Sequence, residues 1–205
     1  MARTARTDSP TKARLLDAAQ RLMLTKGYAA STVEEICNTA KLTKGSFFHY
    51  FESKEHLGKA LLERFCQSAK QQHRQACCEA RDPLDRVFKA LDCIAHMAER
   101  PTSANGCLLG TFAQELSDTH PEIRSLCARG FRDWTAGLKQ ELDEAKRLRR
   151  PKASIDTQSL AEHLVAVVEG SLILAKASRR PAIVRQSVAH VRRYLANLFG
   201  ERTGK

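Results

Sequence analysis

The chain has 205 residues, of which 42% are hydrophobic and 28% are charged, and this composition excludes an intrinsically disordered chain. The net charge of +11 favours partners that carry negative charge, among which nucleic acids are the commonest. No apolar run approaches the roughly 18 residues that span a bilayer, and the first ten residues lack the apolar core of a secretory signal. We therefore expect a cytoplasmic protein without a membrane partner.

The seven cysteines form neither a C-x-x-C pair nor an even-numbered framework, which argues against a secreted, disulfide-bonded scaffold. We expect their thiols to be reduced. The histidines show no metal-ligand spacing, and no glycine-rich phosphate loop or catalytic metal motif is present. The sequence therefore predicts no metal, no cofactor and no catalytic residues.

The N-terminal part of the chain predicts a helix followed by two short helices. Leu15, Ala19 and Met23 form part of one apolar stripe on a helix over residues 11–26, and Gly27 ends it. The caps predicted for the next three helices are Ser31 with Glu34 or Thr32 with Glu35, then Thr43, and then Ser53. Two short helices joined by a tight turn, with a supporting helix before them, are typical of a helix-turn-helix.

Residues 32–57, TVEEICNTAKLTKGSFFHYFESKEHL, resemble the DNA-binding module of TetR-family regulators. The shared pattern includes Gly45-Ser46 at the start of the recognition helix, an aromatic run, and Ser53-Lys54-Glu55 at the start of the fourth helix. The resemblance implies an all-α fold of about nine helices. Residues 1–52 would form the helix-turn-helix domain, and residues 53–205 the effector-sensing and dimerisation domain.

The resemblance also implies a function and a set of contact residues. The expected protein is a ligand-responsive regulator, a repressor, that binds a near-palindromic double-stranded DNA operator as a homodimer. Short side chains at Gly45 and Ser46 would let the recognition helix approach phosphates and base edges. The predicted DNA-binding residues are Thr32, Thr43, Lys44, Gly45, Ser46, Phe48, His49, Tyr50 and Lys54.

Four residues around the recognition helix depart from the family pattern or face the core. Lys41 stands where the family often has Gly, so the turn has either a non-glycine residue at positive φ or a different shape. Phe48 stands where the family often has Tyr and lacks its hydroxyl donor. Phe47 and Phe51 lie four residues apart on one helix face, so we expect them in the core rather than on DNA.

The chain remains helical beyond residue 60, with helices predicted over 83–99, 106–116, 121–149, 156–177 and 182–199. The last two helices have broad apolar faces with small residues near their middles. By resemblance, they pair with the same helices of a second chain in a four-helix interface. Alternatively, both faces belong to the core of their own chain.

Cys107 lies in the stretch GCLLGTFAQEL, which resembles a TetR-family branch that includes sensors of reactive electrophiles or oxidants. If Asn105 caps this helix, Cys107 falls in its first turn, where free amides and the helix dipole stabilise a thiolate. The resemblance makes Cys107 the sensor and Lys176 a neighbouring amine that favours the thiolate or traps an oxidised sulfur. The alternative is a buried, inert thiol.

Other effector chemistries stay open. Four residues are candidates for lining a small-molecule cavity, or are plain core residues: Phe112, Phe131, Trp134 and His96. Such a cavity would bind a hydrophobic ligand without covalent chemistry, and a more distant alternative is a cysteine-dependent enzyme. Binding of nucleic acid by charge alone is disfavoured, because residues 1–60 hold ten Lys and Arg against six Asp and Glu.

Overall fold

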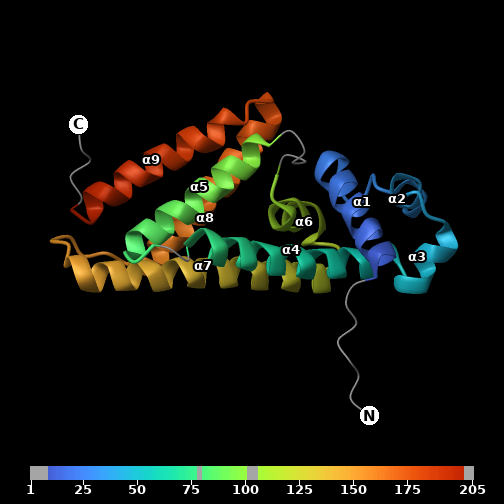
Figure 1. The fold of residues 1–205 in the computed structure, drawn as a ribbon, viewed down its shortest axis with the longest axis horizontal. Helices are drawn as coiled ribbons and strands as arrows, with labels where there is room; N and C mark the ends of the chain where they lie inside the picture. Colours follow the sequence, from blue (N-terminus) through green and yellow to red (C-terminus); the bar gives the residue numbers. More distant parts are fainter. Residues whose placement is uncertain (1–8, 78–79, 101–105, 201–205) are drawn as a thin grey trace, which may run out of the picture. The chain divides into compact units, whose positions relative to one another are not determined.

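The computed structural model describes residues 9–77, 80–100 and 106–200. Over these ranges the chain forms nine α-helices and no strand, which confirms the predicted all-α fold (Figure 1). The helices are α1 (Pro10–Lys26), α2 (Val33–Ala40), α3 (Lys44–Tyr50), α4 (Lys54–Cys77), α5 (Pro83–Glu99), α6 (Leu108–Leu116), α7 (Pro121–Arg149), α8 (Thr157–Ser178) and α9 (Ala182–Leu198). None of these helices is both long and apolar enough to cross a membrane.

The helices form two compact units. The first unit contains residues 1–66 and 108–127, and the second contains residues 67–107 and 128–205. This grouping differs from the expected division at residue 52/53, because α6 and the start of α7 belong with the N-terminal helices. The chain passes from the second unit to the first directly after Cys107.

In the first unit, α1 packs against α2, α3 and α6. The predicted apolar stripe of α1 forms the core here, since Leu15, Ala19 and Met23 are fully buried. Leu57 and Leu61 of α4 are also fully buried. The first unit therefore holds the helix-turn-helix on an apolar base supplied by α1, α4 and α6.

The turn between α2 and α3 is formed by a non-glycine residue in the left-handed region. Lys41 has φ 53° and ψ 49°, so the first of the two predicted alternatives is confirmed. The Lys41 amide donates to the Asn38 carbonyl at 3.0 Å, and the Leu42 amide donates to the Cys37 carbonyl at 2.9 Å. This paired arrangement is the Schellman motif, which satisfies the last carbonyls of a helix.

The second unit packs α5 and α8 against α9. Its core combines apolar residues of α5, α7, α8 and α9, including Leu91, Leu142, Leu164 and Val188. Asp82 and Asp156 cap α5 and α8 through their carboxylates. The second unit is thus a helical bundle with an apolar interior.

Replacing Lys41 by Gly should stabilise the protein by about 0.5–1 kcal/mol, because Gly adopts the left-handed region without the Cβ penalty. Urea unfolding of the variant measures this change. Lys41→Ala is the matched control, since it removes the charge but keeps the Cβ, and it should leave the free energy of unfolding nearly unchanged. Equal stabilisation by Ala and Gly would contradict the backbone explanation.

Candidate nucleic-acid interface and sensor site

Helix α3 is a seven-residue helix fixed at its start and along one side. The Thr43 Oγ1 accepts a hydrogen bond from the Ser46 amide at 3.1 Å, so the predicted cap is confirmed. Phe47 and Phe51 are fully buried, and their ring centroids lie 5.7 Å apart, which confirms their predicted place in the core. The two rings anchor the helix and turn its opposite face outward.

That outward face carries most of the predicted DNA-binding residues. Thr43, Lys44, Gly45 and His49 are exposed, and Phe48 is 57% exposed. A Cβ added to Gly45 would meet only the Thr43 Oγ1, at 3.6 Å. Internal packing therefore does not require a glycine at this position, and its effect is to leave the start of α3 bare on the outside.

The remaining predicted residues near α3 take part in local contacts. Ser46 and Tyr50 are half-buried, and the Tyr50 hydroxyl lies 2.9 Å from the Ser9 Oγ. The Lys44 Nζ lies 3.1 Å from the Glu34 carboxylate, in an ion pair whose two side chains are exposed. Such surface pairs are worth about 0–1 kcal/mol, so Lys44 is readily redirected to a phosphate.

Thr32 takes part in a capping box that holds the start of α2. Its Oγ1 accepts from the Glu35 amide at 3.2 Å, while the Glu35 carboxylate accepts from the Thr32 amide at 3.0 Å. The pairing is thus Thr32 with Glu35, the second of the two predicted alternatives. The Lys26 ammonium and the Thr32 donors together lower the pKa of Glu35 to about 2.

Arg14 supports the helix-turn-helix in a way that the sequence did not suggest. Its guanidinium donates to the carbonyl of Ala40 at 2.5 Å and to that of Lys41 at 3.3 Å. A cation at a helix C-terminus interacts favourably with the helix dipole. Arg14 of α1 thereby fixes the end of α2, directly before the turn that leads into α3.

Lys54 makes contacts within the fold at the position where the resemblance predicts a phosphate contact. Its Nζ donates to the carbonyls of Tyr28 and Ser31, each at 3.1 Å, and lies 4.3 Å from the centroid of the Tyr28 ring. Burial lowers the pKa of Lys54, and the Glu115 carboxylate counteracts that effect. A phosphate contact by Lys54 would require these bonds to break.

The candidate sensor thiol lies immediately before α6. The helix begins at Leu108, so Cys107 occupies the residue before it rather than the first turn that the sequence predicts. Asn105, the expected cap, lies outside the described residues. The Cys107 thiol is hydrogen-bonded to the Glu169 carboxyl group of α8, a partner that nothing in the sequence indicated.

Glu169 is an unusual carboxyl group. Burial raises its pKa, and the Cys107 hydrogen bond counteracts this. Its Oε1 is buried without a hydrogen-bond partner. A raised pKa makes the carboxylate a stronger base than an ordinary one, because the proton it accepts is held more tightly. The pair therefore brings a proton acceptor to the candidate sensor thiol.

The other cysteines include thiols that are poor nucleophiles. Burial and the neighbouring Cys66 raise the pKa of Cys127 to about 11. Burial also raises the pKa of Cys37 and of Cys77. Since the thiolate is the reactive form, these three thiols are protected from electrophiles at neutral pH.

The remaining effector candidates are divided between the two units. Phe112 of α6 is fully buried in the first unit, where its ring packs edge-on against Tyr28 at 5.6 Å. Phe131 and Trp134 are partly buried against the core of the second unit. His96 and Lys176 are exposed on helices of that unit. The described residues contain no group of three metal-ligating side chains.

A supported short helix with a bare, capped start and an outward polar face defines a helix-turn-helix DNA-binding protein. The chain belongs to the TetR family of bacterial regulators. Residues 15–61 match the family described as bacterial regulatory proteins, tetR family. Residues 83–191 match the tetracyclin repressor-like C-terminal domain.

Individual relatives agree with this assignment. The transcriptional regulator AcuR of Cereibacter sphaeroides is 31% identical, over 76% of this chain and 72% of its own length. The transcriptional repressor NemR of Escherichia coli K12 is 28% identical, over 93% of this chain and 96% of its own length. A regulatory protein TetR from Rhodobacter sphaeroides superposes with a TM-score of 0.83 at 27% identity, covering 90% of this chain and 98% of that chain. The structure of the reduced form of E. coli NemR gives a TM-score of 0.77 at 28% identity, covering 89% of this chain and 95% of that chain.

Replacing Glu169 by Gln should stabilise the protein increasingly as pH rises. The pKa of Glu169 is raised by folding, so the native protein binds more protons and the parent loses stability between the ordinary carboxyl pKa and the raised one. Gln carries no charge at any pH and avoids this loss. Urea unfolding from about pH 4 to about pH 8 measures the difference. Glu162→Gln, which changes an exposed carboxylate of the same helix, is the control; parallel pH curves for the Glu169 variant and the parent would refute the prediction.

Proposed function

We propose that this protein is a ligand-responsive repressor that binds a near-palindromic operator through α3 and releases it when an effector acts on the second unit. The observation that carries the proposal is the capped, half-exposed α3, which buries Phe47 and presents Lys44, Gly45 and His49. Relatives named as transcriptional repressors, NemR and DhaR, support repression as the outcome of binding. Operator binding also supports a cytoplasmic location.

The proposed contacts follow from what the α3 surface offers. Thr43, Lys44, His49 and Tyr50 serve as phosphate contacts, which set the position of the helix on the duplex. Ser46 and Lys44 reach base edges, which carry sequence information. Gly45 lets the backbone approach closely, and Thr32 adds a hydroxyl at the start of α2. Phe48 has no hydroxyl, so it offers apolar contact, such as that with a thymine methyl group.

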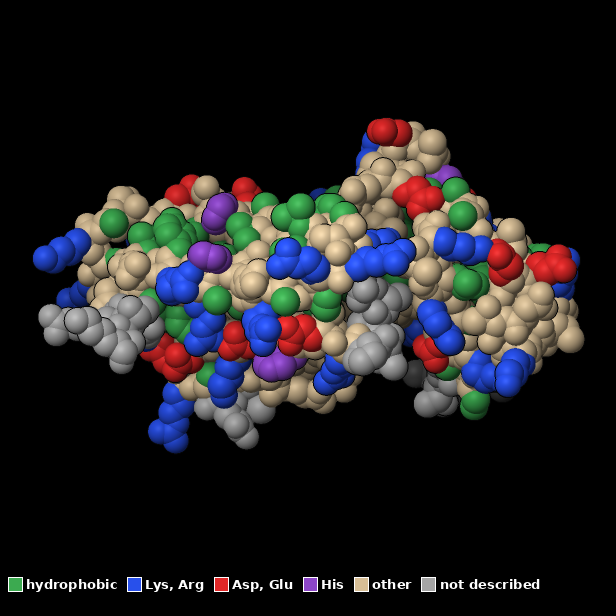
Figure 2. Space-filling view, turned by 90° about the horizontal axis from the view of Figure 1, so that it is seen from above, with side chains coloured by type: hydrophobic (Ala, Val, Ile, Leu, Met, Phe, Trp, Pro, Cys, Tyr) green, Lys and Arg blue, Asp and Glu red, His purple; other side chains and the backbone are tan. Residues whose placement is uncertain are grey.

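The second unit supplies the proposed dimer interface. Three large hydrophobic residues of α8 and α9 are about half exposed in the single chain: Ile173 at 48%, Leu174 at 60% and Tyr194 at 50%. Figure 2 shows hydrophobic side chains exposed among Lys and Arg on the face of the molecule seen there. Pairing of α8 and α9 with their symmetry mates would cover such residues and bring two copies of α3 to successive major grooves.

The proposed effector is a reactive electrophile that adds to Cys107. When the thiol adds to an alkene that is conjugated with a carbonyl group, the sulfur forms a bond to the β-carbon of the alkene. The π electrons of the alkene then move toward the carbonyl oxygen. The thiol proton passes to the Glu169 carboxylate, which is hydrogen-bonded to that thiol. The second candidate is a non-covalent hydrophobic ligand beside Phe131 and Trp134.

Replacing Lys44 by Ala should weaken operator binding and flatten its dependence on salt, because each lost phosphate contact lowers the slope of log K against log salt by about 0.9. Glu34→Gln is the matched variant: it removes the carboxylate that pairs with Lys44 and should strengthen binding. Electrophoretic titration against the DNA flanking the gene measures both, with two chains expected per operator. Unchanged salt slope in the Lys44 variant would remove that residue from the interface.

Cys107→Ser should bind operator as the parent does but keep it bound in the presence of N-ethylmaleimide, an activated alkene. The serine hydroxyl is a much weaker nucleophile than a thiol, so no adduct forms. Cys127→Ser is the control, since that thiol is buried with a raised pKa, and this variant should respond like the parent. Glu169→Gln should slow adduct formation, because an amide does not accept the proton. Release of operator from the Cys107 variant at the parent's dose would exclude the thiol sensor and leave the hydrophobic-ligand hypothesis.

A further inference from the structure

The loop between α1 and α2 is held between an anion and a cation that come from other helices of the first unit. The Glu115 carboxylate of α6 accepts hydrogen bonds from the amides of Tyr28 and Ala29, both at 2.7 Å. On the other side, the Lys54 ammonium of α4 donates to the carbonyls of Tyr28 and Ser31. We call these contacts of Glu115 and Lys54 with residues 28–31 the loop clamp.

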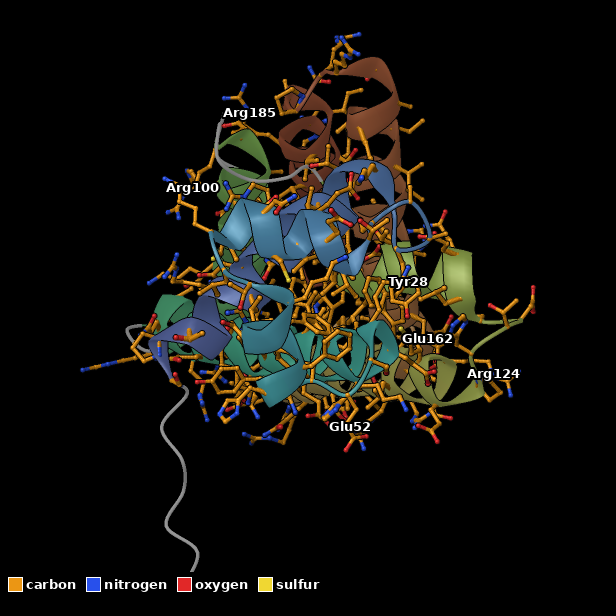
Figure 3. The ribbon with its side chains drawn as sticks, turned by 90° about the vertical axis from the view of Figure 1, so that its right-hand side faces the viewer. Tyr28, Glu52, Arg100, Arg124, Glu162 and Arg185 are labelled. Carbon is orange, nitrogen blue, oxygen red and sulfur yellow. The ribbon has the colours of Figure 1, made fainter. Side chains whose placement is uncertain are left out.

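The loop is shaped to receive the carboxylate. Gly27 has φ +90°, and a Cβ at that position would lie 2.9 Å from the Glu115 Oε2. Gly58 of α4 similarly leaves room for the rings of Tyr28 and Phe112, since its Cβ would approach them to 3.3 and 3.5 Å. In Figure 3, Tyr28 lies well inside the first unit, whereas Glu52 and Arg124 lie at its margins.

Each charged group of the loop clamp faces backbone groups that carry the opposite partial charge. Amide hydrogens of the loop point to the carboxylate, and its carbonyl oxygens point to the ammonium, so both sets of hydrogen bonds are charge-assisted. Glu115 itself is exposed, which allows water to take its place when the carboxylate moves away. The clamp is therefore strong enough to orient the loop and still open to release.

Glu115 connects the clamp to the proposed sensor through one short helix. Helix α6 has nine residues; Cys107 directly precedes it, and Glu115 is its penultimate residue. A helix of this length spans about 13 Å, and its backbone hydrogen bonds join one turn to the next. A displacement of Cys107 is therefore expected to reach the carboxylate that holds the loop.

The geometry points to Glu115 as the residue that positions the helix-turn-helix for operator binding, and to withdrawal of its carboxylate from the Tyr28 and Ala29 amides as the step that ends binding. The release half of this inference rests on the proposed function. Lys54 then holds the loop from the side opposite Glu115 and does not contact a phosphate. Neither residue touches DNA in this scheme, so both act through the orientation of α2 and α3.

The first test is Glu115→Gln, in which the amide keeps the size of the side chain but loses the charge. Operator affinity should fall about tenfold, which corresponds to the loss of one charge-assisted hydrogen bond, while the salt slope stays that of the parent. Less N-ethylmaleimide should then be needed for release. Glu122→Gln removes an exposed carboxylate that pairs with Lys59 in the same unit, and it should change neither quantity.

The second test is Lys54→Gln, which distinguishes the clamp from direct DNA contact. A clamp residue lowers affinity without changing the salt slope, whereas a lost phosphate contact lowers the slope by about 0.9. A reduced slope for Lys54→Gln, or parental affinity for Glu115→Gln, would overturn the inference. Should the parent itself ignore N-ethylmaleimide, the thiol-sensor proposal fails, and the affinity and salt slopes of the two variants still decide whether the clamp positions the helix-turn-helix.

Discussion

The proposed DNA-binding surface depends on the burial of two phenylalanine rings beneath a helix that is too short to be stable alone. Isolated helices of fewer than about 12 residues are marginal in water, and α3 has seven. Phe47 and Phe51 hold it against the rest of the first unit, and the Thr43 cap fixes its first turn. Since one face of α3 is occupied in this way, the opposite face is left for a ligand, and its exposed start is where an anion is best received.

The net positive charge of the protein does not mean that its basic side chains are free, because many of them are paired. Many basic side chains are engaged within the units, as in Arg64 with Asp17 at 2.8 Å and Arg86 with Glu141 at 2.6 Å. Lys54 is bonded to loop carbonyls, and Lys44 faces Glu34. The net charge of +11 therefore favours encounter with nucleic acid, whereas in the proposed function binding at one site depends on the geometry of α3.

The sequence was sufficient for features that are set by residues close in the chain. The Thr43 cap and the helix over 83–99 follow from rules that act over a few residues, whereas the sequence left two shapes open for the turn at Lys41. It was not sufficient for contacts between distant segments. Glu115 meets Tyr28 across 87 positions, and no local pattern distinguishes this carboxylate from a solvated one. The grouping of α6 with the N-terminal helices escaped prediction for the same reason.

The position of Cys107 is the physical reason why we propose this thiol, among several, as the sensor. Buried thiols such as Cys127 are held in the protonated, unreactive form, and modifying one would disrupt the core that encloses it. Cys107 is only partly buried, bonded to the basic Glu169, and lies where the chain leaves the second unit and enters α6. In the proposed mechanism, an adduct there changes the residue that directly precedes α6, the short helix whose other end carries Glu115. The proposed adduct would therefore act at the point where the chain passes from one unit to the other, and not inside either core.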